Sequence, residues 1–329
     1  MKFRDRDKVA KHIAMSLGCG VDIQDKSTPS YEFTKSTRNE KINEVLCRYF
    51  DIPETEAFKS AYDQVASGQG NESENLLTIH SSALLALLCF YRVEAGNSLS
   101  IECDGSLYEF DKVFFEVENI VQVPADRPSS IDVALYSTKN KAMLLLESKF
   151  TEPTNGTNLK NIGEKYLNRL KLLSETGIRY IEETRRFDCE KVTVGKKERL
   201  IYYDGIKQMI AHLIGVETGP VRLPGSNKVK QEEYVMCFDE ADNIYLGCIL
   251  FNDADFFEGT EYEMISSYID LYERSMTKLT ETIEGQNKGR LHLLTKPMTY
   301  QEVFANKKLK YRLPEKILKF YNIENSPSL

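Results

Sequence analysis

The chain has 329 residues, of which 41% are hydrophobic and 28% charged, and its formal net charge is −7. This length and composition can bury a sizeable core and suit one large domain or two smaller ones. The longest uninterrupted apolar run, residues 83–91, is too short for a membrane span, and the polar N-terminus has no signal-peptide character, so we expect a cytoplasmic protein with no membrane partner. Seven scattered cysteines without a CxxC pair indicate neither a disulfide framework nor a cysteine zinc site.

The acidic net charge argues against a protein that coats nucleic acid, because phosphates are bound mainly by Lys and Arg. The segment from Lys288 to Lys319 departs from this balance, with nine basic and two acidic residues. It is compatible with a surface that faces a polyanion and equally with a solvated, lysine-rich helix.

Helical patterns dominate the first 95 residues and predict amphipathic helices near residues 4–17, 38–50 and 54–65. A further helix is predicted over residues 76–94, where the run from Ala83 to Tyr91 is apolar nearly all round, which is typical of a buried helix. We therefore predict an N-terminal helical extension over residues 1–75, followed by a central core.

Three strand-like runs follow in quick succession, at residues 107–123, 130–137 and 141–150. Their short connections predict an antiparallel meander. Beyond them, the pattern predicts helices over 159–176 and 204–216, strands near 234–238 and 245–251, and a long helix over 259–284. These elements define a predicted core over residues 76–255 and a C-terminal helical, basic region over 256–329.

The second and third runs of the meander bring two acids together. A two-residue loop at Lys139-Asn140 is the simplest closure, and it places Asp132 directly opposite Glu147. Lys149 is two residues beyond Glu147, so both side chains share one face of the strand. Facing carboxylates repel each other unless a divalent cation lies between them, and oxygen ligands favour Mg²⁺, with Mn²⁺ as a substitute.

This set of side chains suits the hydrolysis of a phosphodiester. A metal neutralises the phosphate and acidifies a water, the acids hold the metal, and the lysine orients or deprotonates the nucleophile. A lone ExK tripeptide marks a solvated strand end far more often than an active site, so the facing Asp132 and the apolar run Met143 to Leu146 carry the interpretation.

At Asp132 and Glu147-Ser148-Lys149 the sequence resembles the PD-(D/E)xK, or restriction-endonuclease-like, nuclease superfamily, and the stretches 127–132 and 144–150 look like bacterial restriction endonucleases. The resemblance covers roughly residues 76–251. It implies an α/β fold with an αβββαβ core, in which helices flank a mixed central sheet. It also implies DNA as the substrate, and products with a 5′-phosphate and a 3′-hydroxyl.

The resemblance also implies roles for further residues. Asp132, Glu147 and the backbone carbonyl of Ser148 would hold the metal, and Lys149 would act with them in catalysis. The helix acid of many members is absent from residues 76–90, and Glu116 is its candidate substitute, whereas Glu118 on the same face is expected to meet solvent.

Two further candidates lie on the helix predicted over 204–216. Gln208 and His212 are expected on the face away from Ile206, Met209 and Leu213, and they look like the QxxxY signature of RecB-like nucleases with His in place of Tyr. The family reading assigns Gln208 to catalysis and His212, together with Arg127, to substrate binding, although Gln at such a site is often simply exposed.

Three readings of function stay open. The first is a metal-dependent, restriction-type DNA endonuclease, which would be expected to form a homodimer on a symmetric site. The second is a repair or RecB-like exonuclease, which the helix of Gln208 favours. The third is a non-catalytic nucleic-acid-binding protein on a nuclease fold, against which the intact Asp132, Glu147 and Lys149 argue. No Walker A, GxGxxG, GxSxG or HExxH motif is present.

Overall fold

The computed structural model describes residues 21–22, 30–31, 38–68, 76, 81–93, 97–121, 128–154, 191–194, 197–200, 204–222, 230–253, 257, 260–283, 289–304 and 311–323. The helices predicted over 4–17 and 159–176, and the candidate substrate-binding residue Arg127, lie outside these described residues.

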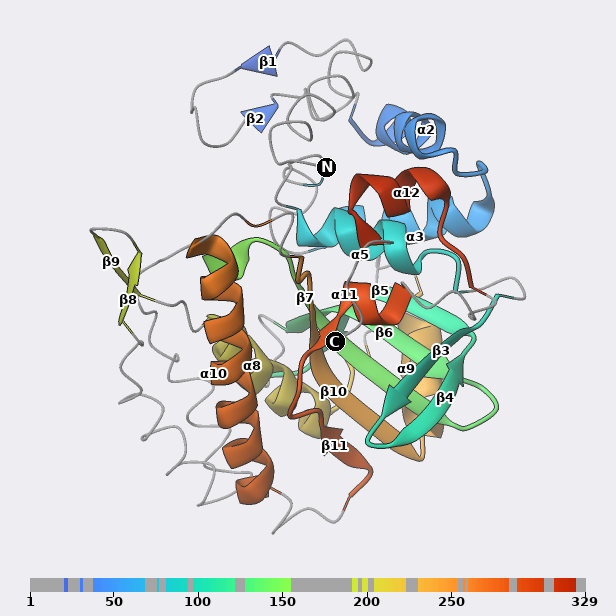
Figure 1. The fold of residues 1–329 in the computed structure, drawn as a ribbon. Coiled ribbons are helices and arrows are strands. Elements are labelled where there is room, and N and C mark those ends of the chain that lie inside the picture. The colour runs from blue at the N-terminus through green and yellow to red at the C-terminus, as the bar shows by residue number, and fades with distance from the viewer. Residues whose placement is uncertain are drawn as a thin grey trace.

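A mixed six-stranded sheet forms the centre of the protein (Figure 1). Its strands are β5 (Lys112–Asn119), β6 (Ser129–Ser137), β7 (Ala142–Lys149), β10 (Asn243–Leu250), β11 (Leu291–Leu293) and β12 (Met298–Thr299). The first three form the predicted antiparallel meander, and β10 runs parallel to β7. Both β11 and β12 pair with the other edge of β10, which gives the order β11-β10-β7-β6-β5. The predicted α/β class and mixed sheet flanked by helices are confirmed.

The central strands are buried along nearly their whole length. Every residue of β7 is buried, and β10 is buried from its second residue onward. Continuous burial is typical of strands that are covered on both faces. The apolar runs MLLL in β7 and IYL in β10 therefore place the sheet in the middle of the core.

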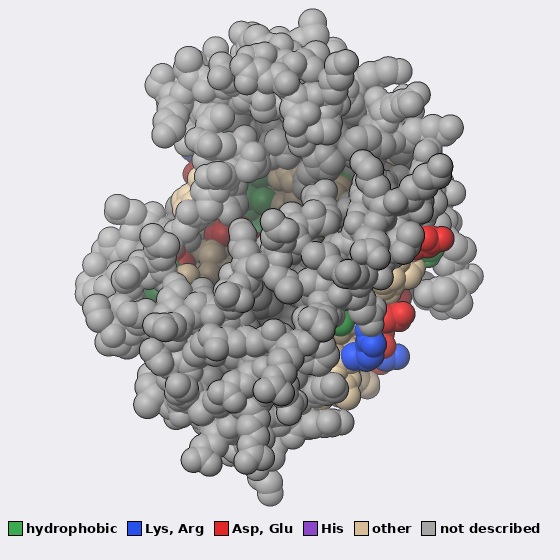
Figure 2. All heavy atoms as spheres, turned by 90° about the vertical axis from the view of Figure 1, so that its left-hand side faces the viewer, with side chains coloured by type: hydrophobic (Ala, Val, Ile, Leu, Met, Phe, Trp, Pro, Cys, Tyr) green, Lys and Arg blue, Asp and Glu red, His purple; other side chains and the backbone are tan. Residues whose placement is uncertain are grey.

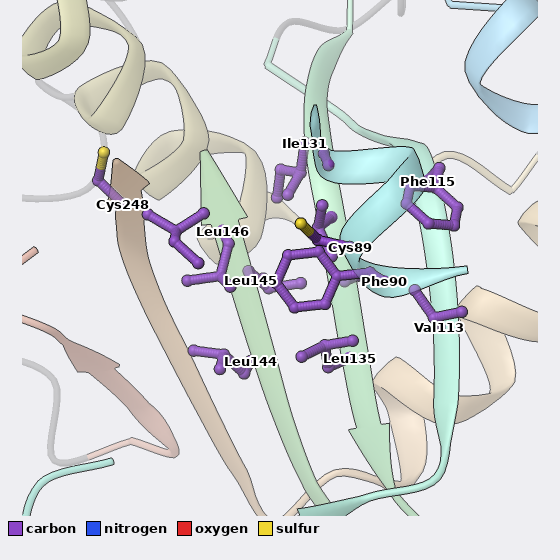
Figure 3. Close-up of a cluster of buried hydrophobic side chains, with 14 of the residues drawn as sticks. Cys89, Phe90, Val113, Phe115, Ile131, Leu135, Leu144, Leu145, Leu146 and Cys248 are labelled. Atoms are coloured by element: carbon purple, nitrogen blue, oxygen red, sulfur yellow. The ribbon is translucent and has the colours of Figure 1, made fainter. Parts of the chain in front are cut away.

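One face of the sheet is covered by the helices α3 (Glu56–Ala66) and α5 (Ser82–Phe90). Ser81 caps α5 by accepting the Leu84 N–H at 3.0 Å. Seven of the nine residues of α5 are buried. Figure 3 shows Cys89 and Phe90 of α5 packed against side chains of β5, β6 and β7. The predicted buried helix is confirmed.

The other face is covered by α8 (Asp204–Thr218) and α9 (Gln231–Glu240), which lie behind the sheet in Figure 3, while α10 (Thr260–Ile283) packs on α8. Gly215 lets α8 approach β5 and β6 closely, because a Cβ at this position would lie 2.9 Å from the Asn119 Cβ and 3.3 Å from the Ser129 Cβ. The predicted helices over 204–216 and 259–284 are confirmed.

The structure corrects three details of the sequence interpretation. The predicted strand near 234–238 is part of α9, because Tyr234, Cys237 and Phe238 recur at helical spacing and form its buried side. The run 107–123 is split at Asp111 into β4 (Ser106–Phe110), which pairs with β3 (Leu99–Cys103), and β5. The C-terminal region is not purely helical, since β11 and β12 extend the sheet.

The terminal segments pack on the same core. The predicted α2 (Arg38–Phe50) is confirmed, and its Phe50 ring lies 5.3 Å from that of Phe320 in α12 (Glu315–Phe320). The short helix α11 (Tyr300–Phe304) begins directly after β12. The remaining short elements are β1 (Val21–Asp22), β2 (Ser30–Tyr31), the 3-10 helix η1 (Glu152–Thr154), β8 (Lys191–Val194) and β9 (Lys197–Leu200). No helix among the described residues combines the length and apolar character that crossing a bilayer requires.

Candidate active site

The candidate site forms where β6 and β7 separate. Their main-chain pairing runs from Ser137↔Ala142 to Val133↔Leu146, and the same register continued by one residue sets Asp132 opposite Glu147. The connecting turn covers residues 138–141 in place of the expected two-residue loop, but the register is the predicted one. Beyond Val133 the ladder ends, and the Asp132 carboxylate itself accepts the Ser148 N–H, at 2.6 Å.

The Ser148 peptide is thereby oriented toward Asp132. In a strand, the N–H and C=O of one residue point to the same side, so the Ser148 carbonyl points toward β6 as its N–H does. On the β10 side of β7, the neighbouring Lys149 carbonyl accepts the Phe251 N–H at 3.0 Å. The carbonyl that the resemblance implies as a metal ligand thus faces the gap left by the ended ladder.

Glu147 is held by two nitrogen donors on the sheet face covered by α8. Its Oε1 accepts from Lys149 Nζ at 2.7 Å, and its Oε2 lies 2.7 Å from His212 Nε2. The Glu147 side chain is 3% exposed and that of Lys149 8%. This is a buried ion pair with both carboxylate oxygens occupied.

The charges set the protonation of this pair. Burial raises the pKa of Glu147, but the Lys149 ammonium, followed by His212, outweighs it and lowers the pKa to about 2. Burial lowers the pKa of Lys149, but the carboxylates of Glu147, Glu152 and Asp132 outweigh it and raise the pKa. Near neutral pH the two side chains are therefore a carboxylate and an ammonium.

Asp132 has the opposite tendency. Burial, followed by the charges of Glu147 and Glu116, raises its pKa well above the usual range, against the smaller effects of Lys149 and the Ser148 N–H. On β5, Glu116 lies opposite Asp132 of β6. These two residues are the one unpaired position in the strand register between Phe115↔Val133 and Val117↔Ile131. Asp132 is therefore subject to the negative charges of two other acids where the strands separate.

Glu116 has an unusual backbone conformation. Its φ is +51°, a value that a residue with a Cβ rarely adopts, its side chain is 4% exposed, and its Oε2 accepts from Ser130 Oγ at 2.8 Å. Glu118 is also buried, at 7% exposure, so the expectation that it meets solvent is wrong. The reason is that α9 covers this part of β5, where the Gln231 side chain bonds both the N–H and the C=O of Glu118.

The donor set suits a hard divalent cation. Mg²⁺ is commonly bound by one or two carboxylates together with waters, so Asp132, Glu147 and the Ser148 carbonyl are the groups that would hold one here. A cation between the two acids would also offset the charge of Glu147, which after burial is the largest cause of the raised pKa of Asp132. In the part of the chain that the structure describes, no group of three or more His, Cys, Asp or Glu side chains is arranged to hold a metal ion, so a cation here would depend on two acids and a main-chain carbonyl.

The candidates on α8 have different environments. Gln208 is partly buried, and its Oε1 is enclosed without a hydrogen-bond partner among the described residues. His212 is 4% exposed and lies on the sheet-facing side of α8 with Met209 and Leu213, so the expectation that it lies on the opposite face is wrong. Both of its ring nitrogens are engaged within the protein, by Glu147 and by Ser129.

Three contributors were not predicted from the sequence. Ser129 Oγ lies 2.5 Å from His212 Nδ1, and Tyr300 of α11 hydrogen-bonds Ser148 Oγ at 2.7 Å from the opposite face of the sheet. Glu152 accepts the Phe150 N–H at 2.6 Å and acts electrostatically on Lys149. Glu152 could have been suspected from its place just after Lys149, but the other two residues approach only through tertiary packing.

Among the described residues of the basic C-terminal segment, several cations are already engaged. Lys316 pairs with Asp51, Lys319 pairs with Glu315, and Arg290 donates to main-chain carbonyls at the end of α9. On the face shown in Figure 2, the visible Lys and Arg side chains of the described residues lie beside Asp and Glu, and no broad basic patch stands out among them.

A cavity of about 660 Å³ lies elsewhere, between the β3–β4 hairpin and residues 294–303. Its lining includes Ile101, Glu102, Leu107, Lys296 and Met298, and none of the candidate site residues. The acids and the lysine of the candidate site therefore do not line this cavity.

Comparison of the chain with protein-family models, curated proteins and solved structures finds no match. The functional interpretation consequently depends on the site geometry.

Proposed function

We propose that the protein is a metal-dependent nuclease that hydrolyses DNA phosphodiester bonds as a restriction-type endonuclease of the PD-(D/E)xK kind. The observation that carries the proposal is the placement of Asp132 opposite Glu147 at the separation of β6 and β7, with Lys149 bonded to Glu147. Carboxylates are seldom retained face to face in a buried sheet without a cation to bind.

The topology supports a restriction-endonuclease-like core. The order α5, β5, β6, β7, α8, β10 follows the αβββαβ sequence that the resemblance implies, with the acids on the second and third strands. The β3–β4 hairpin, α9 and the strands β11 and β12 would be additions to that core.

In this proposal each side chain has a defined task. Asp132, Glu147 and the Ser148 carbonyl would hold Mg²⁺, with Glu116 as a further acid nearby. A bound Mg²⁺ would supply Lewis-acid stabilisation of the phosphate and acidify a water. The Lys149 ammonium would orient the nucleophile or the phosphate, and Gln208, whose Oε1 has no partner, would hydrogen-bond a group at the same centre.

The experiment is cleavage of supercoiled plasmid, linear duplex and single-stranded DNA at low salt with Mg²⁺ or Mn²⁺. We expect nicked and linear plasmid with 5′-phosphate ends, loss of cleavage with EDTA or Asp132→Asn, and no loss with Asp239→Asn. Asp239 is a matched control because its carboxylate pairs with Arg222 on the surface. Absence of cleavage on every substrate, with bound metal, would support a non-catalytic binding protein instead.

A second candidate function is a RecB-like or repair exonuclease. The observation that favours it is the partnerless Oε1 of Gln208 one helical turn before His212 on α8, in the arrangement of the RecB-like signature. Degradation confined to linear substrates, with intact closed plasmid, would select this alternative.

A further inference from the structure

Glu147 lies at the centre of a hydrogen-bonded chain of four side chains. The proposed reaction gives a role to Glu147 and Lys149 but none to the other two members, Ser129 and His212. Ser129 on β6, His212 on α8 and Glu147 on β7 are linked in series by contacts of 2.5 and 2.7 Å, and Lys149 completes the line from the other carboxylate oxygen. Three of these residues come from separate elements, so the chain exists only in the folded protein.

The proton positions in this chain follow from donor chemistry. An ionised carboxylate only accepts, so the His212 Nε2 carries a hydrogen toward Glu147. At Nδ1, a neutral imidazole accepts from the Ser129 hydroxyl and an imidazolium donates to it, so the contact with Ser129 is satisfied in either form. Both ring nitrogens of His212 therefore have a hydrogen-bond partner. The contact with Ser129 orients the ring so that Nε2–H points at Glu147.

The two hydrogen bonds to Glu147 come from donors that differ in conformational freedom. The contact with His212 is made by a rigid, buried ring on α8, the helix that Gly215 allows close to Ser129. The contact with Lys149 is made by the ammonium of a buried side chain with four rotatable bonds, and Glu152 is a second carboxylate that acts on the same ammonium. Oε1 can therefore exchange its partner, while Oε2 is kept in place.

We propose that a divalent cation and the Lys149 ammonium compete for Oε1 of Glu147, while His212, oriented by Ser129, keeps Oε2. Cation binding would then release the ammonium toward the substrate, and Lys149 would act as a built-in block of the metal position in the resting protein. His212 and Ser129 are positioning residues in this arrangement, because they act through Glu147. The inference rests on the proposed metal site, but it concerns metal binding itself and not cleavage.

The competition predicts opposite effects for the two neighbours of Glu147. Partners that orient a metal ligand typically change metal affinity about 10- to 100-fold when they are removed. His212→Leu should therefore weaken binding by about tenfold or more, and Ser129→Ala by less. His212→Gln, whose amide can both donate and accept, should restore most of the affinity. Lys149→Met should instead tighten binding, because the competitor for Oε1 is gone.

The experiment measures Mn²⁺ binding to the full chain without DNA, by the electron paramagnetic resonance signal of free Mn²⁺. Lys149→Gln is a second lysine variant that removes the charge but keeps an N–H donor for Glu147, should Lys149→Met not fold. His292→Gln and Lys112→Met are matched controls, since they remove contacts with Asn243 and Glu233 away from the site, and both should bind as the wild type does.

The outcomes separate this inference from the proposed function. Equal or weaker binding in the folded lysine variants would overturn the exchange at Oε1, and wild-type binding in His212→Leu would overturn the role of His212 at Oε2, even if the protein cuts DNA. The expected pattern without DNA cleavage would support the exchange and leave the nuclease proposal refuted. No Mn²⁺ binding by the wild type would overturn both.

Discussion

Lys149→Met tests the buried charge pair through the stability of the protein. The substitution keeps the length of the side chain and removes its charge, so Glu147 is left with His212 as its one remaining donor. Removal of one partner from a buried pair is strongly destabilising, because the other charge stays desolvated without compensation.

The magnitude follows from the pKa of Glu147. Its usual value of 4.5 is lowered to about 2, and each pKa unit corresponds to about 1.4 kcal/mol, so the interactions that keep Glu147 ionised contribute about 3 kcal/mol at pH 7. Lys149 is the largest of the favourable contributors. We therefore expect Lys149→Met to lower the free energy of unfolding by about 2 to 3 kcal/mol.

The sign of the pH dependence follows from the lowered pKa. The contribution of Glu147 is fully present above about pH 4.5 and is lost as the pH falls through about 2. The difference in stability between wild type and Lys149→Met should therefore be largest near neutral pH and shrink in acid. The higher pKa of Asp132 acts in the opposite direction, because its ionisation disfavours the folded state at neutral pH.

The assay is urea unfolding in the presence of EDTA, followed by circular dichroism at pH 7 and pH 3. Lys112→Met is the matched control, because Lys112 and its partner Glu233 are both 36% exposed, and its effect should stay within about 0.5 kcal/mol. Wild-type stability of Lys149→Met at pH 7 would refute the ionised, buried pair on which this reasoning depends.

Three further substitutions test the surroundings of the site. Gly215→Ala should lower the free energy of unfolding by about 2 kcal/mol, because its Cβ would meet the Asn119 Cβ at 2.9 Å, and an unchanged melting temperature would contradict that contact. Gln231→Leu should cost about 1 to 2 kcal/mol in urea unfolding, since it removes the side-chain acceptor of the Glu118 N–H while the Glu118 C=O keeps its bond from the Val221 N–H, and a neutral effect would speak against the burial of this N–H. Tyr300→Phe should cost only about 1 kcal/mol, because the Ser148 hydroxyl keeps its bond to a carbonyl of α5, and a larger loss would indicate a further role for the phenol.

Much of the site was predictable because it depends on local geometry. Alternation along a strand puts Glu147 and Lys149 on one face, and a short turn between two strands sets the register that brings Asp132 opposite Glu147. Both rules involve residues fewer than twenty positions apart. The same local logic identified α5, α8 and α10, whose hydrophobic patterns are long and regular.

Short segments were harder to interpret for a physical reason. The residues from Tyr234 to Phe238 are rich in aromatic and apolar side chains, which strands and helices both accommodate, and in the folded protein Tyr234 packs on Phe114 from the helix α9. The strands β11 and β12 are two or three residues long, so they form only because the edge of β10 is available to pair with them.

The amino-acid sequence by itself determined the sheet-forming meander and the three side chains Asp132, Glu147 and Lys149 that it brings together. The tertiary structure alone decided what surrounds them. His212 reaches Glu147 across 65 positions and Ser129 across 83, so their contacts depend on how closely α8 packs against the sheet. Local periodicity reports which side of an element is apolar, whereas the partner of a buried polar group is selected by the packing of elements that are distant in the chain.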